Sequence, residues 1–345
     1  MRERCDFDYQ HGSLICTRIT DKFPDFAYGP HALRCDSCEI KVFGFATFPH
    51  ENNLISFNAS NCKIESVTSN ALSNMKFLQH VYLSHNRISN ISKDAFWGLK
   101  DVQDMYLDHN ELKGLTEGFL NNFQTNLLIL SNNLIEEIPP GVFEGFLGTL
   151  SLDLSHNQVH ALYVDSFLHL DGLEILDLSY NKLCSLPLGA FKHVQTLQQL
   201  NLSHNKFKSF SFGIFSPLIH LNHLNLSHNN FGEFEANVLI PLTSLKLLDI
   251  SSNGLRYIDA QSLHDNSKSL RRLVIADNFW ECMGLVDVVR YLSKMKISVH
   301  METESRYEVM NVNGVACSAV PLYEDISIEA FLEMAWKMST KKLYC

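Results

Sequence analysis

An asparagine recurs at an almost constant interval through most of this 345-residue chain. The interval is 24 residues except for one step of 23, and the series comprises Asn86, Asn110, Asn133, Asn157, Asn181, Asn205, Asn229 and Asn253. Apolar residues recur at fixed offsets around each member of the series. A fixed period of this length indicates a repeat protein in which each unit adds one coil to a solenoid.

The apolar frame is complete around Asn181, where the sequence reads L-x-x-L-x-L-x-x-N-x-L from Leu173. This pattern is the leucine-rich repeat signature. Leu176 and Leu178 alternate with polar residues, which is the period of a half-buried strand. The asparagine amide can donate to and accept from backbone groups that the following turn buries between coils. We therefore predict an α/β solenoid, a leucine-rich repeat horseshoe with a parallel concave β-sheet and disulfide-containing caps at both ends.

The series extends in both directions beyond the eight asparagines. Cys62 and Cys38 precede it at the same spacing, and Asn278 follows it. Cysteine is an accepted alternative at this position. We predict a cap with a hairpin at 1–45, nine to ten repeats at 46–278, a C-terminal cap at 279–322 and an amphipathic helical tail at 323–345.

Charge and composition exclude several functions. The formal net charge of −10 argues against nucleic-acid binding, which favours a basic stripe. No stretch reaches the roughly 18 consecutive apolar residues of a membrane span, so we predict no membrane insertion. No apolar secretory segment follows Met1, so we expect that a signal peptide has been removed or that the sequence begins inside the gene product. No catalytic or ligand-binding motif is present, and we predict no enzyme activity, no cofactor and no metal.

Most of the nine cysteines lie near the two ends of the chain. Solenoid ends expose an apolar cross-section that needs a cap, and disulfide-bonded caps indicate an oxidising compartment. We therefore predict a secreted, extracellular protein. Cys5 and Cys16 flank a four-residue turn that would place them opposite each other in a hairpin. A disulfide between them is one prediction, and pairing of either residue with Cys35 is the alternative.

The C-x-x-C motif and one cysteine within the repeats are interpreted as structural. The C-x-x-C at Cys35 and Cys38 lacks the second pair that zinc would need, and it precedes a strand-like segment where a redox site would precede a helix. Cys184 lies inside a repeat, and we interpret it as a buried free thiol.

The C-terminal cap is expected to begin where the repeats end. Trp280 would cover the last coil, and a bridge between Cys282 and Cys317 would clamp a short helix over it. This arrangement resembles the C-terminal cap of extracellular leucine-rich repeat proteins, and its single bridge resembles secreted leucine-rich immune proteins of dipteran insects. The front segment, from the Cys35 motif through Phe43-Gly-Phe45 and Ile55–Ser60, is similar to the entry of the same family.

The resemblance implies an innate-immune role. Members of that family circulate as disulfide-linked partners and bind complement-like thioester proteins or pathogen surfaces. They usually carry a coiled coil after the cap, whereas this sequence stops at Cys345. The tail from Ile326 to Met338 is predicted either to pack on the cap or to form the stub of an interchain helix. In the second case Cys345 would bridge a disulfide-linked dimer, whose other member would be another leucine-rich repeat chain.

Positions that alternate with the buried leucines should face outward from the concave sheet. An apolar and aromatic run followed by an acidic continuation occupies these positions, and we predict that it binds a partner: Tyr82, Tyr106, Leu127, Ile129, Asp153 and Asp177. The alternative is an ordinary solvated sheet with a few apolar residues. Histidines also precede many of the series asparagines, as at His204, and we interpret them as a common filling of the repeat consensus.

Four N-x-[ST] sequons are candidate glycosylation sites in a secreted protein, namely Asn58, Asn90, Asn201 and Asn225. Glycans at Asn201 and Asn225 would cover the middle of the concave face. Binding would then shift toward its N-terminal part or to the convex side. The sequence thus predicts an extracellular protein-recognition module, with the ectodomain of a receptor or adhesion protein as the alternative.

Overall fold

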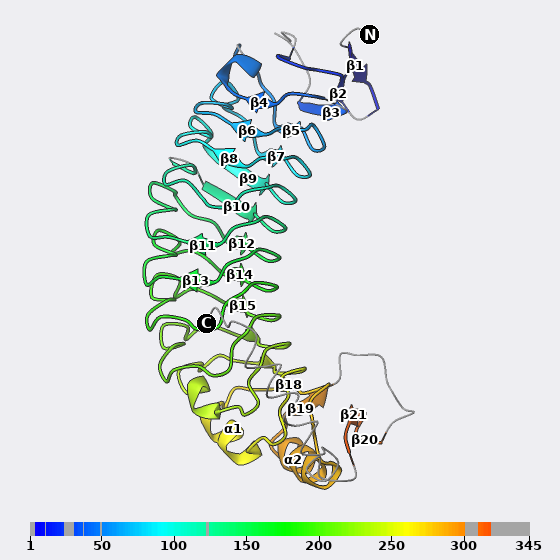
Figure 1. Ribbon diagram of the computed structural model, residues 1–345, viewed down its shortest axis with the longest axis vertical. Helices are drawn as coiled ribbons and strands as arrows, with labels where there is room; N and C mark the ends of the chain where they lie inside the picture. The colour runs from blue at the N-terminus through cyan, green and yellow to red at the C-terminus, as the bar shows by residue number, and fades with distance from the viewer. Residues whose placement is uncertain are drawn as a thin grey trace, which may run out of the picture.

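The structure of the protein is a computed structural model that describes residues 4–10, 12–23, 31–36, 38–48, 50–121, 124–300 and 310–318. The described chain is a curved stack of coils, with both of its described α-helices at the C-terminal end (Figure 1). This architecture confirms the predicted leucine-rich repeat solenoid, with its largely parallel sheet and its disulfide-containing caps. Among the described residues, no helix combines the length and apolar character needed to cross a membrane.

One long sheet runs along the whole stack, and each coil contributes one strand to it. Within the described residues the order is β1 (Arg4–Asp8), β2 (Ser13–Thr17), β3 (Ala32–Asp36), β5 (Ser56–Asn58), β7 (His80–Tyr82), β9 (Asp101–Tyr106), β10 (Gln124–Ile129), β12 (Ser151–Asp153), β14 (Ile175–Asp177), β15 (Gln199–Asn201), β16 (His223–Asn225), β17 (Leu247–Asp249), β18 (Arg272–Val274) and β19 (Ser298–His300). In the described part of this sheet only the β1–β2 pair is antiparallel, and the later pairs are parallel. The repeat period sets the register, so that Leu176 lies opposite Leu200.

Shorter elements close each coil on its other side. They are β4 (Val42–Phe43), β6 (Ser66–Val67) and β8 (Asn90–Ile91) in one small sheet, and β11 (Glu137–Ile138) and β13 (Ala161–Leu162) in another. The remaining elements are the 3-10 helices η1 (Phe45–Thr47) and η2 (Ala236–Leu239), the helices α1 (Ala260–Asn266) and α2 (Cys282–Lys294), and the hairpin β20 (Asn311–Val312) and β21 (Val315–Ala316).

The core is a column of leucines and phenylalanines between the two sides of each coil. Phe167, Phe191 and Phe215 are fully buried and stack in succession, with ring centroids 6.5 and 6.2 Å apart. Each coil covers only its neighbours, so the apolar face of one repeat is buried by the next. The stack therefore gains its stability from contacts between coils.

The recurring asparagines hold the turns that follow the main strands. At Asn157, the amide Nδ2 donates to the carbonyls of Leu130 and Leu154 at 3.0 and 3.1 Å, and Oδ1 accepts the Ile135 N–H at 3.0 Å. Asn278 makes the same kind of bonds at the end of the series, where its Oδ1 accepts the N–H of Asn253 at 2.8 Å. The series is a continuous asparagine ladder that satisfies backbone groups buried between coils.

Disulfides close both ends of the stack. Cys5 lies directly opposite Cys16 in the β1–β2 hairpin and is bonded to it, and a second disulfide joins Cys35 to Cys38. At the far end Cys282, the first residue of α2, is bonded to Cys317. The 323–345 tail and Cys345, the predicted dimer bridge, lie outside the described residues.

The C-terminal cap also covers the last coil with apolar side chains. Leu285 and Leu292 of α2 are buried, and Trp280, which lies just before α2 in the sequence, is almost fully buried. The Trp280 indole N–H donates to the Ile275 carbonyl at 2.7 Å, so burial leaves its polar group satisfied.

The interpretation of Cys184 as a buried free thiol is wrong. The residue is disulfide-bonded, and its side chain is only half-buried. It follows Leu183, whose side chain enters the core, so residue 184 points away from the core in the alternation of the coil. Alternation along an extended segment therefore outweighs the apolar character of a cysteine.

Candidate functional site

The predicted partner-binding residues lie together on the main sheet. The registers of β7, β9, β10, β12 and β14 place five of them in one row across consecutive strands, in the order Tyr82, Tyr106, Ile129, Asp153 and Asp177. Leu127 lies in the adjacent row on β10, opposite Asp104. All six side chains are partly exposed. We call Tyr82, Tyr106, Leu127 and Ile129 the concave patch.

The two tyrosines of the concave patch stack on each other. Their rings stack with centroids 4.9 Å apart and an interplanar angle of 19°. Partial burial, assisted by the negative charge of Asp104, raises the pKa of Tyr82 and of Tyr106. A tyrosine is protonated at neutral pH even without this shift, so both phenols are hydrogen-bond donors there. A rigid ring pair with polar tips is a surface suited to protein contacts.

A hydrogen-bonded histidine and aspartate border the tyrosines, and sequence reasoning missed their pairing. His80 Nδ1 lies 2.8 Å from Asp104 Oδ2, and the two residues are opposite each other on β7 and β9. Both positions are two residues before a tyrosine, so the same register that aligns Tyr82 with Tyr106 aligns His80 with Asp104. Comparing neighbouring members of the outward row that contains His80 and Asp104 would have found the pair.

Asp153 and Asp177, which continue the tyrosine row, also form hydrogen bonds with the backbone. Asp153 and Asp177 each accept the backbone N–H two residues later, at 2.8 Å, and Asp177 also accepts the Asn201 amide at 3.0 Å. Such bonds are Asx turns that fix the exit of each strand. These carboxylates are therefore partly committed to the backbone, and the apolar tyrosine end carries more of the free surface.

The four sequons differ in their surroundings. Asn58, Asn201 and Asn225 are partly buried on the main sheet, and each Oδ1 accepts the backbone N–H two residues later. Asn90 is exposed at β8, away from the main sheet (Figure 1). Use of these sites for glycosylation stays a prediction, and the structure offers Asn90 the most room.

The histidines that precede the ladder asparagines form stacked columns. His156, Tyr180, His204 and His228 stack with centroid separations of 4.0, 3.8 and 3.9 Å, and His85 stacks on His109 at 4.1 Å. These residues have positive φ between 52° and 54°, the left-handed conformation that the turn before each asparagine requires. Burial, with the nearby His228 and His156, lowers the pKa of His204. Sequence reasoning missed Tyr180 because it is not a histidine.

Two groups in the described part of the chain bring three metal-ligating side chains within 4.8 Å of one another. One is the exposed group of His85, Asp108 and His109. Both Asp108 oxygens already have partners there, since His109 Nδ1 lies at 2.8 Å and the Ser84 hydroxyl donates at 2.6 Å. The other group is the buried set of Cys35, Cys38 and Cys62, where a disulfide already joins two of the sulfurs.

The comparisons with known proteins agree with this fold. The leucine-rich repeat family model matches residues 52–112, 124–183 and 172–231. A chain of the Drosophila Toll–Spatzle complex is similar with a TM-score of 0.66 and 22% identity, over 79% of this chain and 36% of that chain. A chain of the TLR13–ssRNA13 complex is similar with a TM-score of 0.57 and 22% identity, over 83% of this chain and 41% of that chain.

The chain thus spans less than half the length of either of these two chains. At this level of identity the similarity concerns the fold alone. No curated protein sequence matches the chain significantly.

Proposed function

We propose that this leucine-rich repeat protein is an extracellular recognition module that binds a protein partner through the concave patch, in an innate-immune role. The observation that carries the proposal is the Tyr82–Tyr106 stack, continued on the next strand by Leu127 and Ile129. A contiguous aromatic and aliphatic surface on a rigid sheet is typical of interface centres, where tyrosine is enriched. The His80–Asp104 pair supplies polar groups next to it.

Charge favours a protein over a nucleic acid as the partner. The net charge is −10, and the groups next to the tyrosines include Asp104 and Asp108. A phosphate backbone would be repelled from such a surface, because nucleic-acid affinity depends on lysine and arginine contacts. The two similar structures illustrate the choice, since one is a complex with Spatzle and the other a complex with single-stranded RNA. The fold alone does not distinguish a protein partner from an RNA partner, so the choice depends on the charge and chemistry of the surface.

The extracellular location is supported by the caps. Disulfides at Cys5–Cys16 and Cys282–Cys317 lie at opposite ends of the stack, where the apolar cross-section needs protection. Such bonds persist in oxidising compartments. The innate-immune role rests on the cap motifs that resemble secreted dipteran immune proteins, whose partners are complement-like proteins or pathogen surfaces.

The proposal is tested by comparing three forms of the full chain as bait for extracellular fluid of the source organism. The forms are wild type, the Tyr82→Ala/Tyr106→Ala double variant and Tyr163→Ala. Tyr163 is a matched control because it is an exposed tyrosine outside the main sheet, bonded to Glu137. Circular dichroism establishes that all three are folded.

We expect one or more proteins to bind wild type and Tyr163→Ala but not the double variant, and the purified partner to show at least a tenfold weaker affinity for the double variant. A partner that binds all three forms equally would contradict the assignment of the concave patch. Failure of wild type to retain any partner would contradict the recognition role itself.

The alternative is that the chain is the recognition part of a receptor or adhesion ectodomain. That alternative uses the same surface and differs only in the segment encoded after residue 345. A full-length transcript with a membrane-spanning segment beyond that residue would favour it over a secreted protein.

A further inference from the structure

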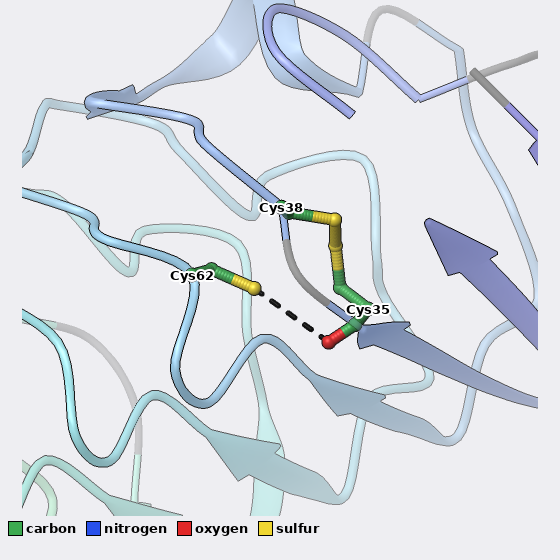
Figure 2. Close-up of side chains that lie close together, drawn as sticks. All are labelled: Cys35, Cys38 and Cys62. Carbon is green, nitrogen blue, oxygen red and sulfur yellow. Dashed lines mark hydrogen bonds between the residues drawn. A yellow bond between two sulfur atoms is a disulfide. The ribbon is translucent and has the colours of Figure 1, made fainter. Parts of the chain in front are cut away.

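Three cysteines meet in the entry coils, where two of them replace asparagine in the ladder. Cys35, Cys38 and Cys62 are each at most 2% exposed, and their Sγ atoms lie within 4.8 Å of one another. Cys35 and Cys38 are bonded to each other, while Cys62 is a buried free thiol (Figure 2). A free thiol thus lies beside a disulfide inside the core.

The geometry points to a thiol–disulfide exchange site, in which the Cys62 thiol displaces Cys35 from Cys38 and the disulfide moves from Cys35–Cys38 to Cys38–Cys62. The Cys62 thiol first loses its proton, and the thiolate then attacks Sγ of Cys38. The bond between Cys35 and Cys38 breaks, and Cys35 leaves as a thiolate that takes up a proton. One disulfide and one thiol are present before and after, so no external oxidant or reductant is needed.

The register of the coils favours Cys38 as the sulfur that Cys62 attacks. Strands on both sides of the cysteines pair with the same offset, Arg34 opposite Asn58 before them and Val42 opposite Ser66 after them. Cys38 and Cys62 are therefore at equivalent positions of neighbouring coils. Adjacent coils repeat at about 4.8 Å, which falls within the roughly 4.4–6.8 Å that disulfides need between Cα atoms.

The thiol occupies the place of a ladder amide in its present state. Cys62 Sγ donates to the Cys35 carbonyl at 3.6 Å and to the Ser60 carbonyl at 3.5 Å, and the N–H of Cys38 points to it. Asn86, one coil later, makes the corresponding bonds to Ala59 and Ser84 at 2.9 and 3.3 Å. The cysteine bonds are longer and sulfur is a weak donor, so less is lost when the thiol leaves this position.

The exchange would change what the disulfide holds together. The Cys35–Cys38 bond closes a segment with a sequence separation of 3 residues, within one coil. A Cys38–Cys62 bond would span 24 residues and join the first coil to the second. Longer closed loops restrict the unfolded chain more, so the exchanged form should hold the N-terminal end of the stack more firmly.

The rate of the exchange depends on pH through the attacking thiol. Burial, against the opposing effect of the Cys38 N–H and with a smaller contribution from Asp36, raises the pKa of Cys62 to about 11. Asp36 is itself bonded to Arg34 at 2.8 Å, and the exposed Lys63–Glu39 pair lies next to Cys62 and Cys38 in the chain. Few Cys62 thiols are ionised at neutral pH, so the exchange is slow there and accelerates as pH rises.

The test uses the full oxidised chain in its folded state, without added thiol. Samples are incubated at pH 7.4, 8.4 and 9.4, quenched with acid, unfolded, labelled with N-ethylmaleimide and mapped by mass spectrometry. We expect the label within the three cysteines to be on Cys62 at the start and to move to Cys35, with a rate that rises about tenfold per pH unit. Label that stays on Cys62 at every pH would overturn the exchange.

Two controls separate the exchange from general scrambling. The Cys5–Cys16 and Cys282–Cys317 disulfides should remain unlabelled, and label at those residues with the same time course would attribute the movement to unfolding. The Cys35→Ser variant leaves Cys38 and Cys62 as the two remaining cysteines of this three-cysteine group. We expect it to form a Cys38–Cys62 disulfide on air oxidation while folded, and two persistent free thiols in that variant would also overturn the proposal.

Discussion

Replacement of Asn157 by alanine should destabilise the solenoid far more than the size of the change suggests. Asn157 lies in the middle of the ladder and is 7% exposed. Its amide donates to the carbonyls of Leu130, Leu154 and Ser155 and accepts the N–H of Ile135. Alanine removes every one of these bonds and leaves the Ile135 N–H without a partner between two coils, while the Leu130 and Leu154 carbonyls each keep the amide of a neighbouring ladder asparagine at 3.0 Å.

The magnitude is set by the groups that lose their partner. A buried donor or acceptor left without a partner costs about 1–3 kcal/mol. The Ile135 N–H is left without a partner, and the two lost bonds to carbonyls that keep another donor cost about 0.5–1.5 kcal/mol each, which gives a range of about 2–6 kcal/mol in total. Water entering the space of the lost amide would recover part of the cost, so we expect a loss of about 3 kcal/mol in the free energy of unfolding.

The measurement is urea unfolding followed by far-ultraviolet circular dichroism, with wild type and two variants for comparison. Asn237→Ala is the matched control, because Asn237 is exposed on η2 and its amide makes one long bond of 3.4 Å to Glu235. We expect that control to stay within about 0.5 kcal/mol of wild type. Asn157→Asp keeps the size and the acceptor but loses both donors, and we expect it to be at least as unstable as the alanine variant.

Unfolding of Asn157→Ala and Asn237→Ala at the same urea concentration would refute the stabilising role of the ladder. A lower slope of the Asn157→Ala transition would carry separate information, because it would show that the coils on either side unfold in two steps. In that case the asparagine couples the two halves of the stack as well as stabilising one turn.

Three further predictions concern other parts of the molecule. The pKa of His204 is lowered in the folded state, so as the pH falls His204 binds a proton in the unfolded chain before it does so in the folded chain. The free energy of unfolding should therefore fall as the pH drops from about 6.5 through the folded pKa. Thermal melting between pH 7.5 and 5 should show a smaller decrease in melting temperature for His204→Asn than for wild type. Trp280→Phe removes the indole donor from the Ile275 carbonyl, which keeps the Asn278 amide at 3.1 Å, and should cost about 0.5–1.5 kcal/mol in chemical unfolding; an unchanged unfolding midpoint would contradict a contribution from this bond. Glycopeptide mass spectrometry of protein secreted from eukaryotic cells should find Asn90 occupied and Asn201 unoccupied, since the Asn201 amide already donates to Asp177.

The fold could be predicted from the sequence because the repeat period determines nearly everything about it. A 24-residue spacing places Leu176 opposite Leu200 and continues through each pair of strands from β12 to β17. The apolar frame around Asn278, 25 residues after Asn253, identified it as the last ladder position, and the structure gives it the bonds of a ladder residue. Periodicity carries long-range information in a solenoid because sequence neighbours one period apart are also spatial neighbours.

Features that depend on which sulfur or oxygen meets which partner could not be predicted in the same way. The Cys35–Cys38 disulfide was one of several pairings that sequence separation left open, and Cys184 was interpreted as free. The turn bonds of Asp153 and Asp177 did have a signal, because a serine follows each aspartate by two residues as in an Asx turn. The prediction assigned these aspartates a binding role from their outward position alone and did not consider their part in the turn.

The same period that determines the fold also constructs the surface. Any two outward residues one period apart lie opposite each other on adjacent strands, so two tyrosines at that spacing stack, as Tyr82 and Tyr106 do at 4.9 Å. The rule holds equally at the turn, where His204 and His228 stack at 3.9 Å because both take the conformation required by their ladder asparagines. The concave patch therefore follows the register of the coils, including the single 23-residue step between Tyr106 and Ile129. A recognition surface arises on this scaffold when a few outward positions in neighbouring repeats acquire aromatic or aliphatic side chains, while the ladder beneath them stays unchanged.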